Sequence, residues 1–314
     1  MKVRSFQGFR RPREKIKRGH GLFTLRGEEG KLPRRALAVA AGVALLAVLA
    51  FSLRADPVLM NSAEIATIWD HGVLRVGVRA DVPQMGQGGA GLEVELAALL
   101  ARKIMEADRN WIGAEPVELV EVGAMDVAAK LSDGSIDAAI CLMPKGANEA
   151  YAYSRAYYTD EILFLTRPGE ENIQIKNIDV GCIQNASSTS LYVPSGAVYN
   201  ALAAYIDAHP DDGLTVVSES GTSTRRITTY ASYEDLFKGL ADGDVGAVAL
   251  SALMADKYEG SYPFGVSSVK AGSVDYAVAS LAEQSAVAAI ADIMLASMEQ
   301  DGSLAALKEK YGLK

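Results

Sequence analysis

The chain has 314 residues, of which 49% are apolar and 22% are charged, and its formal net charge at pH 7 is −8. This length and composition indicate a folded protein large enough for two domains, and they exclude a disordered tail. The charge is uneven, because residues 1–35 contain twelve Lys or Arg and three Glu, a net +9, which leaves −17 on the remainder.

A membrane segment is the first predicted element. Residues 36–53 contain no charged side chain and directly follow the basic residues 1–35. The apolar core of a cleavable secretory signal has about 7 to 15 residues, whereas about 18 can cross the hydrocarbon. We therefore predict an uncleaved transmembrane signal anchor, with the leader in the cytoplasm and the acidic remainder periplasmic or extracellular. Cleavage near Val48 and Ala50 is the alternative and gives the same topology. Nucleic acid is not expected as a partner.

Beyond a predicted linker at 54–63, strand-like and helix-like segments alternate. The β-rich run LRVGV at 74–78 is followed by a helical pattern at 91–105. One face of this helix should carry Leu92, Leu96, Leu99, Leu100 and Ile104. A strand at 117–122, a short helix ended by Gly134 and a strand over IDAAIC complete a βαβαβ order. This order predicts an α/β fold with a mainly parallel sheet and a ligand crevice at the carboxyl ends of its strands.

A weak internal repeat indicates two lobes. KLSDGSIDAAI at 130–140 and GLADGDVGAVA at 239–249 share a helix end, an Asp-Gly turn and a strand at the same offsets. VGV at 76–78 and VGC at 180–182 open the two halves. Two lobes of like topology imply a cleft between them.

The stretch CLMPKGANEAYAYSRAYY at 141–158 looks like a loop that leaves the third strand. Its four Tyr favour packing over solute contact. Cys141 and Cys182 each lie in an apolar run, which favours two buried thiols over a disulfide. The three His share no metal-ligand spacing, so neither a metal nor a cofactor is predicted.

Together these segments resemble the type II periplasmic solute-binding proteins, and in particular family 3, which serves ABC importers of amino acids. The similar stretches follow the family order and cover residues 64–314: GVLRVGVRADVPQ, GLEVELAALLARKI, KLSDGSIDAAICLMP, SRAYYTDEILFLTR, DVGCIQNASSTS, TYASYEDLFKGLADGDVGAVAL and SMEQDGSLAALKEKYG. The resemblance implies a two-lobed fold with a two-strand hinge. Lobe 1 would comprise 64–165 and 266–314, and lobe 2 would comprise 166–265.

The residues that grip an amino acid in the family are altered in this chain. The position of the Arg that holds the α-carboxylate falls on Glu149, with Ala147 as the alternative, and the position of the Asp that holds the ammonium group falls on Ser251. An aromatic position after the first strand falls on Met85. Burying a zwitterion without charged partners would cost several kcal/mol, so ordinary amino acids are poor candidates.

Other side chains remain suited to binding. Ser187, Ser188 and Thr189 follow the first strand of lobe 2 and could offer hydroxyl and backbone N–H groups to an oxygen-rich solute, or simply cap a helix. Lys145 is a cation close to the missing Arg. Asp81 and Met143 follow strands of lobe 1 and complete the predicted ligand-binding set.

Three functional hypotheses follow. The favoured one is an extracytoplasmic, membrane-anchored binding protein that captures a small polar solute for an ABC importer with non-standard specificity. The alternative is a ligand-free interaction or sensory module on the same fold. A dehydratase-like enzyme is the weakest hypothesis, because only Glu149 and Asp81 are placed to act as acid or base. Residues 191–226 exceed the usual family connection and have no assigned role.

Overall fold

The structure of the protein is a computed structural model, and the residues that it describes belong to one compact unit: 57–106, 114–123, 126–172, 179–183, 196–209 and 227–313. The predicted leader at 1–35, the predicted anchor at 36–53 and the hydroxyl cluster of Ser187, Ser188 and Thr189 lie outside these ranges. Within them, no helix has the length and apolar character that a membrane crossing requires.

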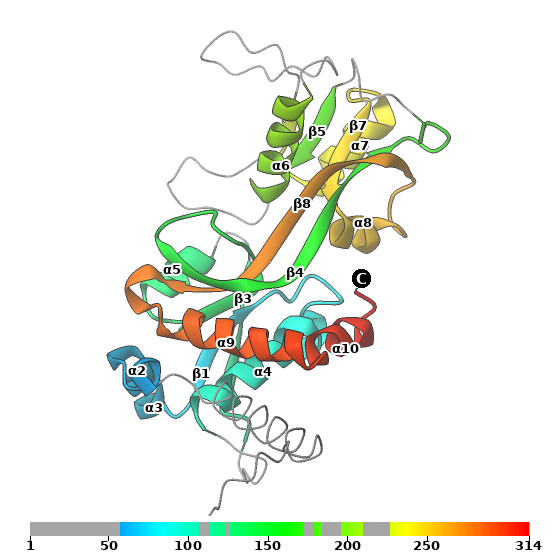
Figure 1. Cartoon of the computed structure of the whole chain (residues 1–314). Helices are drawn as coiled ribbons and strands as arrows, with labels where there is room; N and C mark the ends of the chain where they lie inside the picture. Colours follow the sequence, from blue (N-terminus) through cyan, green and yellow to red (C-terminus); the bar gives the residue numbers. More distant parts are fainter. Residues whose placement is uncertain are drawn as a thin grey trace, which may run out of the picture. The chain divides into compact units, whose positions relative to one another are not determined.

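An eight-stranded mixed sheet organises the described chain (Figure 1), with the strand order β2-β1-β3-β8-β4-β7-β5-β6. The strands are β1 Leu74–Val78, β2 Val117–Glu121, β3 Ala138–Pro144, β4 Tyr151–Thr166, β5 Val180–Ile183, β6 Ile227–Tyr230, β7 Ala247–Ser251 and β8 Gly265–Leu281. β2, β1 and β3 are mutually parallel, as are β7, β5 and β6. We call these two groups of strands, with the loops and helices that follow them, the β1 side and the β7 side.

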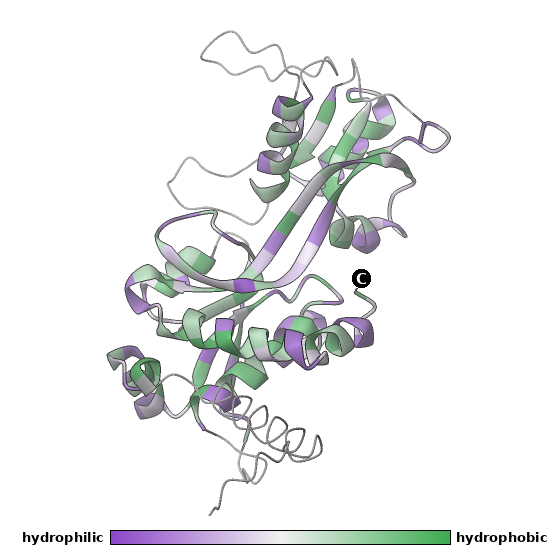
Figure 2. Ribbon diagram, in the orientation of Figure 1, coloured by the Kyte–Doolittle hydropathy of each residue, from purple (hydrophilic) through white to green (hydrophobic). Residues whose placement is uncertain are grey.

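The two sides are joined by β4 and β8, which are 16 and 17 residues long and pair antiparallel with each other. β8 also pairs antiparallel with β3, and β4 with β7. Residues 159–161 of β4 pair with residues 273–275 of β8. Figure 2 shows hydrophilic residues interspersed with apolar ones along both strands. The prediction of a mainly parallel sheet is therefore wrong at its centre, since the connecting strands run against their neighbours.

Helices pack on the strands of both the β1 side and the β7 side. They are α2 Pro57–Met60, α3 Ala63–His71, α4 Leu92–Ile104, α5 Val127–Ser132, α6 Gly196–Ala208, α7 Tyr233–Asp242, α8 Ala252–Tyr258, α9 Ala286–Gln300 and α10 Ser303–Lys310, with short 3₁₀ turns at Gln87–Gly89 and Ala282–Gln284. α4 contacts β1, β2 and α9, whereas α6 and α7 contact β5 and β7. α2 forms part of the segment predicted as the linker 54–63, so that segment is partly helical.

The predicted repeat corresponds to equivalent local structures. A Gly with left-handed backbone follows each helix: Gly134, at φ 73°, comes two residues after the end of α5, and Gly243, at φ 83°, directly follows α7. Each helix leads into a buried strand. Glycine adopts this conformation without the steric cost that a Cβ would bring. An Asp-Gly turn with a left-handed Gly therefore stands at the end of both helices, although the capping residue is Asp133 for α5 and Gly243 for α7.

The apolar face of α4 was predicted correctly except at one position. Leu92, Leu96, Leu100 and Ile104 are fully buried, but Leu99 is 40% exposed. Glu93 lies on the buried face of the same helix and is fully buried. The buried face of α4 therefore includes Glu93 and leaves Leu99 at its edge.

The stretch at 141–158 is mostly strand and not loop. β3 continues to Pro144 and β4 begins at Tyr151, which leaves only residues 145–150 as the connection. Tyr151, Tyr157 and Tyr158 are buried, as expected for packing. The residues typical of a loop, Lys145, Gly146 and Asn148, all fall in this short connection. Cys141 and Cys182 are separate buried thiols.

Candidate functional site

A cavity of about 430 Å³ lies between the turn that follows β3 and the helix α6. The turn belongs to the β1 side, α6 packs on the β7 side, and the connecting strand β8 forms a third wall. Its lining residues are Pro144, Lys145, Gly146, Ala147, Ala197, Asn200, Ala201, Ser273, Val274 and Asp275. Both sides of the sheet and one connecting strand therefore contribute to the same cavity.

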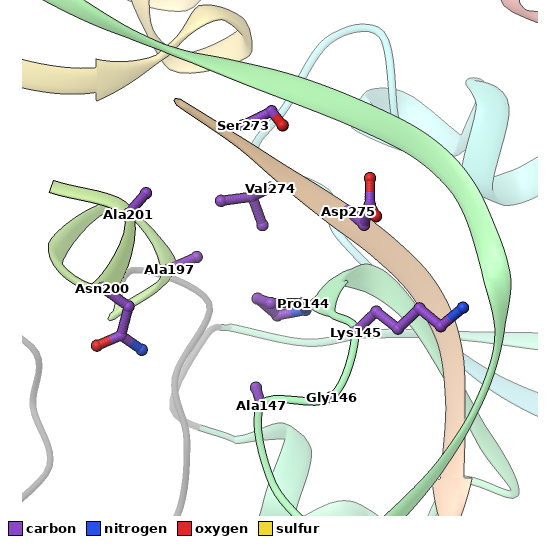
Figure 3. A pocket seen from close by; sticks show the side chains of 10 residues that line it. All are labelled: Pro144, Lys145, Gly146, Ala147, Ala197, Asn200, Ala201, Ser273, Val274 and Asp275. Carbon is purple, nitrogen blue, oxygen red and sulfur yellow. The ribbon is translucent and has the colours of Figure 1, made fainter. Parts of the chain in front are cut away.

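The side chains in Figure 3 differ in their relation to this cavity. Ala147 and Val274 point into the space in front of α6, whereas the side chain of Lys145 extends away from α6. Backbone hydrogen bonding fixes the turn, because the Lys145 N–H donates to the Asp275 carbonyl at 2.8 Å. Lys145 thus lines the cavity mainly through its backbone and the base of its side chain.

Arg155 of β4 pairs with α9, through Asp292 at 3.2 Å. Burial raises the pKa of Asp292, but the hydrogen bonds and charge of Arg155 and the charge of Lys145 outweigh it, so that this pKa lies below its ordinary value. Arg155 also pairs with Glu299 at 2.9 Å. Arg155 is therefore engaged by α9, whereas Lys145 adds only the smallest of the effects on the pKa of Asp292.

The loop after β1 carries a second polar cluster. The Arg79 guanidinium forms two parallel hydrogen bonds to Asp81, at 2.6 and 2.7 Å. Asp81 also pairs with Lys257 of α8, with Nζ and Oδ2 3.1 Å apart. Burial raises the pKa of Asp81, but Arg79 and Lys257 outweigh this effect and hold the pKa well below its usual range. Asp81, a predicted ligand residue, is thus occupied by two cations of the chain itself.

The buried carboxyl group of Glu93 binds the backbone of this loop. Glu93 Oε2 accepts the Arg79 N–H at 3.2 Å, while Oε1 accepts the Leu142 N–H at 2.8 Å and the Tyr157 hydroxyl at 2.7 Å. Leu142 has φ 56° and lies within an irregularity of the β3–β8 pairing. Glu93 therefore satisfies a backbone donor that the ladder does not use. Burial raises the pKa of Glu93 to about 7, against the lowering effect of its hydrogen-bond donors.

Ser251 ends β7 directly before α8 and is buried. Its side chain makes no capping hydrogen bond to α8. Asp160 of β4 supplies an acceptor instead, because its Oδ1 accepts the Leu253 N–H at 3.4 Å. Burial raises the pKa of Asp160 to about 6, while the neighbouring Ser251 hydroxyl and the backbone N–H groups of α8 lower it. A connecting strand thus holds the first turn of the helix that carries Lys257.

The remaining predicted site residues are dispersed. Met85 is fully buried in the main core, and Met143 is buried in a smaller cluster with residues of α5. Glu149 is exposed in the turn after β3. Of the predicted set, Lys145 lines the cavity, whereas Asp81, Met85, Met143, Glu149 and Ser251 do not. Among the described residues no group of three or more metal-ligating side chains occurs.

Several polar residues of the site were not predicted from the sequence. The cations that pair with Asp81 are Arg79 and Lys257. The carboxylates that hold the neighbouring backbone are Glu93, at Leu142, and Asp160, at the first turn of α8. Asn200 lines the cavity. Glu93 had a usable signal, because it stands one position after Leu92 on the apolar face of a helix. The pairing of Asp81 with Lys257 had none, since 176 residues separate the two.

Comparison with known proteins places the chain in a family. The model of the bacterial extracellular solute-binding proteins, family 3, matches residues 74–314. The chain belongs to this family. No curated protein sequence matches it.

Solved structures of similar fold agree with this family assignment. One is the solute receptor for L-cysteine of Neisseria gonorrhoeae, with 20% identity, 79% of this chain and 93% of the other covered, and a TM-score of 0.54. Another is the amino acid ABC transporter substrate-binding protein AbpA from Streptococcus pneumoniae bound to L-arginine, with 17% identity, 78% and 97% coverage, and a TM-score of 0.54. A third is an ancestral amino acid-binding protein, a precursor of cyclohexadienyl dehydratase, with 18% identity, 79% and 98% coverage, and a TM-score of 0.54. At these identities they establish the two-lobed α/β fold of this family 3 protein.

Proposed function

We propose that this family 3 protein is held at the outer face of a membrane by residues 36–53 and captures a small polar solute for an ABC importer. The observation that carries the proposal is the cavity to which the β1 side, the β7 side and β8 all contribute. A solute in such a position contacts both sides at once, so its binding favours the arrangement in which they are close. β4 and β8 supply the two-strand connection about which such sides can move.

The specificity that we propose is non-standard. Ala147, one of the two candidate positions for the family Arg, lines the cavity and has no charge. Of the nearby cations, Arg155 pairs with Asp292 and Glu299, and the side chain of Lys145 extends away from α6 (Figure 3). Asn200 offers a side-chain amide to the cavity, and the Asp275 carboxylate, which accepts the Thr159 hydroxyl at 2.6 Å, adds negative charge nearby. This lining suits a hydrogen-bonding or cationic solute better than an α-carboxylate. Ser187, Ser188 and Thr189 remain proposed contributors of hydroxyl groups.

Binding is favoured over catalysis by the state of Asp81. A general base works best with a pKa near the operating pH, and two cations hold the pKa of Asp81 far below that range. Glu149 is exposed in the turn after β3 and does not line the cavity. Neither of the two residues considered for an enzyme therefore has the environment of an acid–base catalyst.

A thermal-shift screen of the full chain in mild detergent tests the proposal. The panel contains amino acids, amines, short peptides, sugars and organic acids, and a ligand at one hundred times its dissociation constant should stabilise the folded state by about 2.7 kcal/mol. We expect a shift with a neutral or cationic solute and none with ordinary amino acids. A clear shift with ordinary α-amino acids would contradict the proposed change of specificity.

A variant with a restored guanidinium sharpens this test. Ala147→Arg places an Arg in the cavity wall and should create affinity for α-carboxylates, because Arg binds them through two parallel hydrogen bonds. The matched control is Ala147→Gln, which adds a long polar side chain without a charge. Both variants leave the preceding Gly146, with its φ of 73°, unchanged. If the two variants have the same affinity for every carboxylate tested, residue 147 does not contact the solute.

A second candidate function is a ligand-free interaction or sensory module. The observation that favours it is the Asp81–Lys257 ion pair, which joins the two sides without a solute. It predicts that no compound in the panel shifts the melting temperature and that Ala147→Arg gains no affinity. One saturable ligand would exclude it.

A further inference from the structure

An ion pair connects the β1 side to the β7 side at residues that do not line the cavity. Asp81 follows β1 and Lys257 lies on α8, which follows β7. In the sheet, β1 and β7 are separated by β3, β8 and β4. The contact between Asp81 and Lys257 is therefore made across the strands that join the sides, and motion of one side against the other must lengthen or break it.

The Asp81 end of the pair is held rigidly. Arg79 grips both carboxylate oxygens, and its own backbone N–H is bound by the fully buried Glu93. The loop is also folded tightly on itself, since a Cβ at Gly86 would lie 2.3 Å from the Arg79 carbonyl oxygen. The carboxylate is thus presented to α8 in one orientation, which reduces the entropy lost when Lys257 pairs with it.

The Lys257 end is held by packing. Tyr258 lies against Tyr233 of α7 with ring centroids 4.8 Å apart, and the Lys257 ammonium lies 5.4 Å from the Tyr258 ring centroid. Asp160 holds the first turn of α8 from the connecting strand β4. The lysine side chain is 21% exposed and that of Asp81 is 48% exposed. The pair is therefore partly screened by water, and its effect is moderate.

We propose that Arg79, Asp81 and Lys257 form an intramolecular latch that holds the β1 side against the β7 side before any solute binds. In proteins with two such sides, closure depends on bonds made between them. Here the chain supplies one such bond itself. An exposed ion pair shifts an equilibrium by about two- to five-fold, so the latch raises the closed fraction without locking it. The inference concerns the solute-free protein and does not depend on the identity of the solute.

Distance measurements by double electron–electron resonance test the latch. Spin labels are placed on the full chain at Ser132→Cys of α5 and Glu234→Cys of α7, which are exposed and lie on opposite sides. The native Cys141 and Cys182 are fully buried, and a singly substituted chain checks that they take no label. Without added solute, Lys257→Gln and Asp81→Asn should each increase the population at longer distance two- to five-fold.

Three controls give this result its meaning. Lys257→Arg keeps a cation and should retain the wild-type distribution. Lys238→Gln removes the Lys238–Asp242 ion pair, which lies within α7 alone, and should change nothing. Raising NaCl from 0.05 to about 0.5 M should reproduce part of the Lys257→Gln effect in the wild type, because salt screens exposed pairs.

The latch is refuted if Lys257→Gln and Asp81→Asn both leave the distance distribution unchanged, or if Lys238→Gln alters it to the same degree. Melting temperatures of all variants show whether each one is folded. If Lys257→Gln fails to fold, Asp81→Asn and the salt series decide the question. A failure of the solute screen leaves these expectations in place, so the latch and the proposed function can be rejected separately.

Discussion

Replacement of Glu93 by Gln should remove a large part of the pH dependence of stability. Burial raises the pKa of Glu93 from 4.5 to about 7. Between these values the unfolded chain has released the proton while the folded chain still holds it. The free energy of unfolding therefore falls as pH rises from about 4.5 to 7 and stays low above that window.

The magnitude follows from the size of the pKa shift. One pKa unit corresponds to about 1.4 kcal/mol, so the site contributes a loss of about 3 kcal/mol between pH 4.5 and 7.5. Gln cannot ionise, and its single carbonyl oxygen can keep the contacts to Leu142 and Tyr157. Its amide NH₂ would face the Arg79 N–H, which now donates to Oε2, and this mismatch costs about 1 to 2 kcal/mol. We expect Glu93→Gln to be less stable than the wild type near pH 4.5 and more stable above pH 7.

Urea unfolding from pH 4.5 to 8, followed by circular dichroism, measures this difference. Burial raises the pKa of Glu64 to about 7 and that of Asp160 to about 6, and both contribute with the same sign, so the wild type minus variant difference isolates Glu93. Glu118→Gln, at an exposed position on β2, is the matched control. An unchanged pH slope in Glu93→Gln would refute the reasoning, because the carboxylate would then ionise as readily when folded as when unfolded.

Two further substitutions test the geometry of the same region. Gly91 has φ 149°, and a Cβ there would lie 2.1 Å from the Met85 carbonyl oxygen, so Gly91→Ala should lower the free energy of unfolding by at least about 2 kcal/mol, whereas exposed Gly260→Ala, with open space around it, should not. Wild-type stability of Gly91→Ala in urea would show that the loop before α4 is folded differently. Arg155→Ala should lose about 1 kcal/mol of stability with its Asp292 and Glu299 contacts and leave solute affinity unchanged. A tenfold loss of affinity in a folded Arg155→Ala protein would assign that guanidinium to the solute.

Local patterns were sufficient to predict much of the framework. The spacing of leucines in α4, the Asp-Gly turns after α5 and α7, and the alternation of strands and helices all depend on neighbours within a few residues. The family resemblance then gave the two lobes and the two connecting strands. Those features are encoded in short stretches of sequence and do not require knowledge of distant contacts.

The contacts of the candidate site could not be predicted in the same way. The composition of residues 141–158 suggested a loop because Gly, Asn and Lys stand beside the Tyr, yet all but six of these residues are strand. The Asp81–Lys257 pair joins residues that are far apart in the chain, and nothing local distinguishes Lys257 from a solvated lysine. Met85 and Met143 were predicted to contact the solute because of their positions near the ends of strands. Their side chains instead pack with apolar neighbours in the two core clusters.

The position of β8 constrains when the protein can fold. β8 lies between β3 and β4, and α9, which contacts both connecting strands, comes after it in the chain. Until residues 265–281 have emerged, the inner edges of β3 and β4 lack their neighbour and the surface beneath α9 is bare. Such unpaired edges are prone to associate with other chains. The central part of the sheet can therefore be completed only when the carboxyl-terminal region of the chain is available.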